Sequence, residues 1–491
     1  MNALQDSIPM RWPSGPLEIA KRQKTDGFNA QVRQVLEYWH GPAALEILQG
    51  APVNCLVVSW AAGLSEDAEQ QRTIRPLVDA ARQRNLAVVG WVDGEPDSKA
   101  VIAAAQAAGL SAVAIQGFSG KSEFPVIPWG DRAHAPWDTT APVLPVTDNV
   151  WPGVTPIRRD EPSAGPTGVP WLDSNGWYIQ LARARVNSRV WVMYDPPGKG
   201  AVVQPQRYPL AVCDAEAAGG RWVISLDEAL RASLAERNAT AGGTLKTIWN
   251  AVSFFDGHRE WKSYRSLGVV GVISDFSGEN FDFSGEILNL SSRRDLLYRV
   301  IWNLGKGVPD LTGLKAAVWA DSAQPSPQVR KSLLSFVQQG GLLITGPKWG
   351  AEGTAGASSH RRFDVRTLGK GRIAIAREAL SDPWAFVIDI QQLLSHANDV
   401  AKLFNASASG GFNYTASPDG KRALLQLLSY SSGGRSSSNA TAWTRHKYRS
   451  ARLWTLDGEG PTPVEVTASE DGGTEYHLPS MASYVALDFE V

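Results

Sequence analysis

Four short and almost entirely apolar runs in the first 280 residues each end in a polar side chain. They are 86–92 before Asp93, 111–115 before Gln116, 189–194 before Asp195, and 268–274 before Asp275. Near-continuous apolar runs are typical of parallel strands that are buried on both faces. A polar residue at the carboxyl end of such a strand lies where a (β/α)8 barrel carries its chemistry. The pattern therefore predicts a barrel with these side chains at its mouth.

Strand and helix patterns alternate up to about residue 290. Strands are expected at 16–20, 53–60, 86–92, 111–116, 124–129, 189–194, 221–226 and 268–274. Eight strands within roughly 280 residues fit the size of a (β/α)8 barrel. A doubly wound open sheet is the alternative, although no G-x-G-x-x-G motif follows an early strand.

The rest of the chain has a different character. Strand, helix and strand patterns between 314 and 375 predict a small α/β domain, and from about 406 only short strand patterns separated by turn residues remain. We therefore predict an α/β chain of three domains. They are a barrel over 1–292, an α/β domain over 293–405, and a C-terminal β-sandwich over 406–491.

Composition narrows the possible partners. The net charge is -1, so no basic field favours nucleic acid. No apolar run is long enough to cross a membrane, and no signal peptide is visible. We expect a cytoplasmic protein, or a periplasmic or secreted one if a signal peptide was removed. The two cysteines, Cys55 and Cys213, are too few for a thiolate metal site, so neither a metal nor a cofactor is expected.

Tryptophan is unusually abundant, with 19 residues against 14 Phe and 11 Tyr. Indole rings pack on the C–H faces of sugars, and their N–H groups bind hydroxyls. For any single Trp, packing in the core is the more common role. Several nevertheless occur in segments rich in Pro and Gly, which favours a role in binding a carbohydrate: Trp129, Trp137, Trp151, Trp171 and Trp177.

One segment of the predicted α/β domain carries a family resemblance. The segment consists of Ala317-Val318-Trp319-Ala320-Asp321, the run from Ser326 to Lys331, and the run from Phe336 to Thr345, which contains a Gly-Gly-aliphatic-Thr motif. The segment resembles the class I amidotransferase-like trimerisation domain of β-galactosidases. The resemblance implies a (β/α)8 glycoside hydrolase and a homo-oligomer. Amidotransferase activity itself is excluded, because no Cys lies between 293 and 400.

Hydrolysis of a glycosidic bond normally uses two carboxyl groups. Asp195 and Asp275 are candidates because they follow strand patterns, and Asp227 is a third, although helix capping is its other interpretation. An Asx turn is the other interpretation of Asp275. Gln116 stands where the resembled enzymes end strand four with an Asn–Glu pair. An amide cannot donate a proton as an acid, so Gln116 suggests an inactivated form, a binding protein, or an acid elsewhere.

The remaining acidic candidates are assigned to substrate binding: Asp93, Glu95, Asp173 and Glu279. Lys21 and Arg22 are candidates for binding a sugar that carries a carboxylate. We predict a glycoside hydrolase acting on an oligosaccharide or glycoside. A non-catalytic carbohydrate-binding relative and a barrel hydrolase of non-sugar substrates remain the alternatives.

Overall fold

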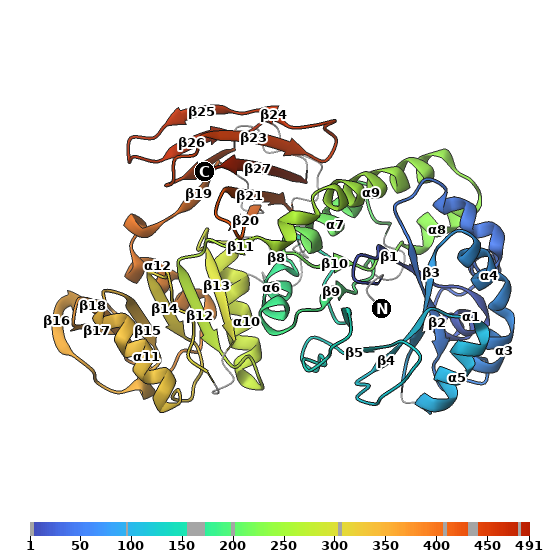
Figure 1. The fold of residues 1–491 in the computed structure, drawn as a ribbon, viewed down its shortest axis with the longest axis horizontal. Helices are drawn as coiled ribbons and strands as arrows, with labels where there is room; N and C mark the ends of the chain where they lie inside the picture. The colour runs from blue at the N-terminus through green and yellow to red at the C-terminus, as the bar shows by residue number, and fades with distance from the viewer. Residues whose placement is uncertain are drawn as a thin grey trace. The chain divides into compact units, whose positions relative to one another are not determined.

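The computed structural model describes residues 4–94, 97–154, 172–197, 202–302, 307–405, 410–430, 440–479 and 483–491 (Figure 1). The chain divides into two compact units. The first consists of Met1–Pro152 and Val186–His258, and the second of Gly153–Arg185 and Arg259–Val491. No helix in the described part of the chain is long and apolar enough to cross a membrane.

The first unit contains two sheets in which every neighbouring pair of strands is parallel. The larger has the order β1 (Pro9–Trp12), β2 (Cys55–Ala61), β3 (Ala87–Val92), β4 (Ala112–Gln116) and β5 (Val126–Trp129). The smaller has the order β10 (Arg221–Trp222), β9 (Arg189–Val192) and β6 (Val143–Val146). Because all pairs are parallel, the carboxyl ends of the strands within each sheet lie at the same edge.

Two isolated parallel bridges link the outer strands of these sheets. Met10 in β1 pairs with Ile224, just after β10, and Gly130, just after β5, pairs with Val146 in β6. A backbone hydrogen bond accompanies each bridge. Arg11 N donates to Ile224 O at 2.8 Å, and Thr147 N donates to Gly130 O at 2.9 Å.

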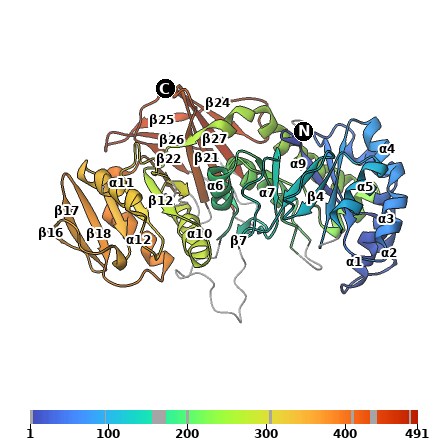
Figure 2. The same ribbon diagram turned by 60° about the horizontal axis from the view of Figure 1, so that its bottom comes forward.

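The helices of the first unit follow its strands and flank them (Figure 1, Figure 2). They are α1 (Gly15–Gln23), α2 (Ala30–His40), α3 (Asp67–Thr73), α4 (Arg75–Gln83), α5 (Ser98–Ala108), α7 (Arg207–Ala217), α8 (Glu228–Ala235) and α9 (Ala239–Gly257). Side-chain caps fix several starts: Asn29 accepts from Val32 N, and Asp97 from Lys99 N. Gly109 ends α5 with a φ of 79°, a left-handed conformation that suits glycine.

Alternate residues of the strands fill the core of the first unit. Cys55 and Val57 of β2, Val89 of β3, Ala112 of β4 and Trp191 of β9 belong to one buried cluster. Burial raises the pKa of the Cys55 thiol to about 12, so Cys55 is an inert core residue. Both cysteines are buried and neither forms a disulfide, which agrees with their apolar sequence context.

Three sequence predictions for the first unit are wrong. The residues 16–20 lie in α1 rather than in a strand, because Pro16 occupies the first turn of a helix, where its missing N–H costs nothing. The strand β6 is absent from the eight predicted strands, since its Pro145 hides the strand pattern. The helix α9 runs without interruption through Gly242-Gly243, although a Gly-Gly pair in the sequence predicts a break.

The second unit contains a mixed sheet of seven strands. Its order is β13 (Tyr298–Trp302), β12 (Val270–Ser274), β14 (Ala316–Trp319), β15 (Leu342–Thr345), β18 (Gly371–Ala376), β17 (Phe363–Leu368) and β16 (Thr354–Ser359). The first five strands pair in parallel, and β17 and β16 add an antiparallel edge (Figure 2). The helices here are α6 (Gly176–Arg185), α10 (Glu279–Ser292), α11 (Pro327–Gln338) and α12 (Pro383–Leu394).

This sheet overturns one prediction that bears on the site. The run 268–274 was predicted as the eighth barrel strand, but β12 pairs with β13 and β14 in the second unit. Asp275, which follows β12, therefore belongs to the second unit. The chain passes between the two units after Pro152, after Arg185 and after His258. A buried parallel strand followed by a helix has the same pattern in either sheet, and only long-range pairing distinguishes them.

Antiparallel strands form two further sheets in the second unit. One has the order β11 (Arg265–Ser266), β20 (Gly410–Ala416), β21 (Arg422–Ser429), β27 (Tyr484–Glu490), β23 (Ser450–Thr455) and β24 (Thr462–Pro463). The other has the order β19 (Ala401–Phe404), β22 (Thr441–Thr444), β26 (Thr474–His477) and β25 (Glu465–Ala468). Phe412, Leu425 and Leu487 of the first share a buried cluster with Ala442 and Tyr476 of the second.

Asp295 gives the second unit a testable dependence on pH. Burial, with Asp399 nearby, raises the pKa of Asp295 to about 6, although Leu403 N donates to its carboxylate at 3.4 Å. The folded chain therefore retains this proton above pH ~4, where an unfolded Asp has lost it. The raised pKa of Asp295 therefore increases the free energy of unfolding below about pH 4, and this contribution is lost as the pH rises to about 6.

We expect Asp295→Asn to remove this loss. An amide oxygen can still accept from Leu403 N, and Asn tolerates the φ of 54° at this position. The variant should have an unfolding temperature close to that of the wild type at pH 4 and a few degrees higher at pH 7, as expected for a gain of about 1 kcal/mol. Asp457→Asn, in an exposed turn, is the control. An equal shift at both pH values would contradict this role of the Asp295 charge.

Candidate functional site

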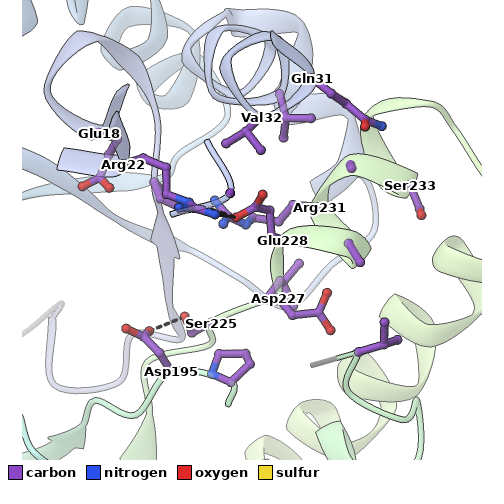
Figure 3. A pocket seen from close by; sticks show the side chains of 18 of the residues that line it. Glu18, Arg22, Gln31, Val32, Asp195, Ser225, Asp227, Glu228, Arg231 and Ser233 are labelled. Atoms are coloured by element: carbon purple, nitrogen blue, oxygen red, sulfur yellow. Dashed lines mark hydrogen bonds and ion pairs between the residues drawn. The ribbon is translucent and has the colours of Figure 1, made fainter. Parts of the chain in front are cut away.

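A cavity of about 1100 Å³ lies in the first unit, next to the carboxyl ends of β1, β9 and β10 (Figure 3). Its lining includes Arg11 of β1, Asp195 after β9, and Ser225 after β10. Helices α1, α2 and α8 complete the wall with the residues Glu18, Arg22, Val32, Val35, Glu228 and Arg231. This is the edge at which parallel α/β folds usually carry their sites.

Asp195 is held in this cavity by one hydrogen bond. Ser225 Oγ donates to Asp195 Oδ1 at 2.6 Å, and Figure 3 shows both side chains at the cavity wall. The side chain of Asp195 is exposed, and Pro196 and Pro197 follow it in an extended loop. The structure thus places Asp195 at a strand end and in an accessible cavity.

Glu18 is a second carboxylate in the same cavity. Ser59 Oγ donates a hydrogen bond to Glu18 Oε1, and Lys21 Nζ lies 3.5 Å from the same oxygen. Lys21 also forms an ion pair with Asp93 Oδ2 at 2.6 Å, and Trp91 Nε1 donates to Asp93 Oδ1 at 2.7 Å. Asp93 therefore positions Lys21, which in turn balances the charge of Glu18.

Two half-buried arginines bring positive charge to this group of acids. Burial by itself would lower the pKa of Arg11, but the carboxylates of Asp195, Glu18 and Asp93 raise it above its usual value. Burial lowers the pKa of Arg231, and the carboxylates of Glu18, Glu228 and Asp195 offset this effect only in part. The cavity therefore combines acids and guanidinium groups at close quarters.

Asp227 lines the cavity, but its oxygens are already occupied. Oδ1 accepts from Leu230 N at 2.6 Å, which makes Asp227 the N-cap of α8. Oδ2 accepts from Val203 N at 3.1 Å and from Tyr208 Oη at 3.0 Å. The capping interpretation of the sequence is confirmed, and this carboxylate holds the loop before α8 in place.

Three of the aromatic residues predicted to face a sugar belong to the first unit, and they differ in burial and packing. Trp129, at the end of β5, is buried and stacks on Trp91 with ring centroids 4.4 Å apart. Trp151 packs edge-on against Tyr194, Tyr208 and Trp222 at 5.6 to 5.9 Å. Trp137 is half-buried in the segment between β5 and β6. Gln116 is exposed at the end of β4, in register with Trp129.

Four predicted site residues belong to the second unit. Asp275 accepts from Ser277 N at 3.0 Å and from Asn280 Nδ2 at 3.1 Å. The bond from Ser277 N is the one expected for an Asx turn, which was the other interpretation of Asp275. Glu279 begins α10 and lines a smaller cavity of about 250 Å³. Asp173 lies in the two-residue strand β8 (Leu172–Asp173), and Trp177 of α6 packs against Phe281. Glu95 and Trp171 lie outside the described residues.

The sequence interpretation missed Glu18, Arg11, Arg231 and Ser225. Glu18 was hidden by the incorrect strand at 16–20, because its place in the first turn of α1 was not recognised. Arg11 carried a usable signal, since it is the one charged residue in the apolar β1 run Pro9–Trp12. Within the described residues, no group of His, Cys, Asp and Glu is arranged to hold a metal ion.

Comparison with known proteins shows the fold. No protein-family model matches this chain, and no curated protein does. The α-L-fucosidase isoenzyme 2 from Paenibacillus thiaminolyticus is similar over 98% of this chain and 99% of its own, with a TM-score of 0.57 and 9% identity. This chain therefore shares its fold with that protein.

Two other glycoside hydrolases are more distant in structure. The β-galactosidase from Bacillus circulans sp. alkalophilus is similar over 87% of this chain and 68% of its own, with a TM-score of 0.46 and 10% identity. The exo-β-1,4-mannosidase Op5Man5 from Opitutaceae bacterium strain TAV5 is similar over 78% and 93%, with a TM-score of 0.46 and 12% identity.

The aromatic packing around Trp151 generates a test of its role. We expect Trp151→Ala to destabilise the chain by about 2 to 3 kcal/mol, less than the ~3 to 5 kcal/mol typical of a fully buried Trp, because this side chain is half-buried. Trp151→Phe retains a ring that can pack on Tyr208 and should lose much less. Thermal unfolding of both variants is the measurement. An unchanged unfolding temperature together with weaker sugar binding would support the predicted substrate-facing role instead.

Proposed function

We propose that this chain is a glycoside hydrolase that acts on an oligosaccharide or glycoside in the cavity of the first unit. The observation that carries the proposal is the pair Asp195 and Glu18. Both carboxylates line one cavity, and each is held by a serine hydroxyl. Two positioned carboxyl groups are the minimum that hydrolysis of a glycosidic bond normally requires.

We assign different roles to the two acids. Asp195 uses Oδ1 to accept from Ser225, which leaves Oδ2 to carry a proton and donate it to the leaving oxygen as the glycosidic bond breaks. Glu18 lies beside the Lys21 ammonium, which balances the charge of an ionised carboxylate. Glu18 therefore supplies the negative charge toward the anomeric carbon, as nucleophile or as the base that activates water.

This assignment changes the predicted set of catalytic residues. Asp227 is committed to capping α8, and Asp275 belongs to the second unit. The contribution of Gln116 stays a prediction. Its exposure at the end of β4 favours the second candidate function, a carbohydrate-binding protein without hydrolytic activity, because an amide cannot act as the acid.

We also propose an architecture for each of the two units. We propose that the strands of the two sheets of the first unit close into a (β/α)8 barrel, with β6 in place of the predicted eighth strand. The bridges Met10–Ile224 and Gly130–Val146 support this closure. In the second unit, the seven-stranded sheet would correspond to the amidotransferase-like domain, and the two antiparallel sheets with their shared core would correspond to the β-sandwich.

Activity of variants tests the proposed pair. We expect Asp195→Asn and Glu18→Gln each to reduce kcat by about 10²- to 10⁴-fold on aryl glycosides, because each removes one proton-transferring or charged group. A panel of nitrophenyl glycosides that includes α-L-fucoside, β-galactoside and β-mannoside is the first assay. Glu69→Gln, an exposed residue of α3 that does not line the cavity, is the matched control and should remain within twofold of the wild type.

The same assay separates the two candidate functions. Sugar binding without hydrolysis of any glycoside would support the binding protein. Wild-type turnover by both Asp195→Asn and Glu18→Gln would exclude this pair. Unfolding temperatures of the variants must match the wild type for the comparison to hold.

Assembly is a separate prediction. The resemblance of 317–345 to a trimerisation domain implies a homo-oligomer with part of its interface in 293–400. We expect light scattering to give a multiple of 53.1 kDa. A mass of one chain at every concentration would contradict it.

A further inference from the structure

Three arginines line the cavity of the first unit, and within the described residues only one of them forms an ion pair with a carboxylate. Arg22 binds Glu228 Oε2 through Nε at 3.1 Å and through Nη2 at 2.9 Å. Among the residues that the structure describes, the side chains of Arg11 and Arg231 have no hydrogen-bond or ion-pair partner, and Arg231 Nε is fully buried without one. Figure 3 shows Arg231 and Arg22 on the same wall of the cavity.

The neighbouring acids do not satisfy these two arginines. In the described chain, no carboxylate oxygen lies within 4.0 Å of either guanidinium. Glu18 is held by Ser59 and Lys21, while Asp195 is held by Ser225. The acids therefore attract Arg11 and Arg231 electrostatically without forming ion pairs with them. Apart from Arg231 Nε, which is fully buried, the N–H groups of these two side chains remain accessible at the cavity.

A half-buried guanidinium without a partner is costly, because it has lost part of its water and gained no anion. The lowered pKa of Arg231 reflects this burial first, and the repulsion from Arg11 adds to it. An anionic group bound between the two arginines would compensate both charges. Arginine is suited to a planar carboxylate, which its fork of N–H groups binds through two parallel hydrogen bonds.

We infer that the substrate of this cavity carries a carboxylate, as in a glycoside of a uronic acid, and that Arg11 and Arg231 bind it. The inference rests on the proposed function, since it concerns the same cavity. A carboxylate carries a single charge, which suits a cavity that also holds Glu18 and Asp195 better than the double charge of a phosphate. The sequence had suggested Lys21 and Arg22 for this role, but both are engaged in ion pairs.

Binding of free monosaccharides to the full chain tests the inference without requiring catalysis. Isothermal titration with D-glucuronate and D-galacturonate is compared with D-glucose and D-galactose. We expect each uronate to bind at least tenfold more tightly than its neutral counterpart, and the difference to shrink as salt rises. Arg231→Gln and Arg11→Gln should each remove this preference. Arg231→Lys should restore part of it, because the charge returns without the fork.

Arg237→Gln is the matched control, because Arg237 lies just after α8 and forms an exposed ion pair with Glu46. It should retain the full preference. Since Arg11 lies in a strand, Arg11→Gln counts only if its unfolding temperature matches the wild type. Arg231→Gln provides the independent variant if it does not.

The outcomes separate this inference from the proposed function. Equal binding of uronate and neutral sugar would overturn the inference, even if neutral glycosides are hydrolysed. A uronate preference that depends on Arg231, in a chain that hydrolyses nothing, would support the inference and contradict the hydrolase. Galactose 6-sulfate binding as tightly as galacturonate would overturn the assignment to a carboxylate.

Discussion

Parallel strands must be buried on both faces, and this constraint governs both units of the chain. The strands of the parallel sheets are apolar along almost their whole length, so polar groups there lie mainly at the strand ends and in the helices that follow. In the first unit, the exceptions Arg11 in β1 and Ser59 in β2 both face the charged group at the cavity. The location of the candidate site is therefore a consequence of how the sheets are buried.

The charges at this cavity depend on one another. Lys21 connects Asp93 to Glu18, and Arg11 lies within the field of Asp195, Glu18 and Asp93. Removing one member leaves another charge uncompensated in a partly desolvated place, which is usually more costly than the interaction itself. Conservative amide substitutions are therefore better probes of function here than truncations to alanine.

The tryptophans show why a residue type alone is weak evidence for function. Indole rings suit sugars, yet Trp12, Trp39, Trp60 and Trp191 are fully buried, and Trp129 stacks within the core. An indole ring buries a larger apolar area than other side chains, so a tryptophan often contributes to core packing. In this chain, the excess of tryptophan mainly reflects the packing of strands against helices.

The sequence by itself determined much of the local structure. The strands at 55–61, 87–92 and 112–116 follow from their apolar runs, and the starts of α2, α5 and α8 follow from Asn29, Asp97 and Asp227 as caps. Capping and burial periodicity act over a few residues, so the sequence reveals them directly. It also indicated Asp195 at a strand end.

Only the tertiary structure decided which strands share a sheet and which side chains meet. The run ending at Asp275 pairs with β13 and β14, and the proline-containing β6 joins β9 in the first unit. Glu18, Arg11 and Arg231 come from two helices and a strand that lie up to 220 residues apart in the chain, so no local pattern could group them. Strand pairing and charge proximity are long-range properties, because they depend on how the whole chain buries its apolar surface.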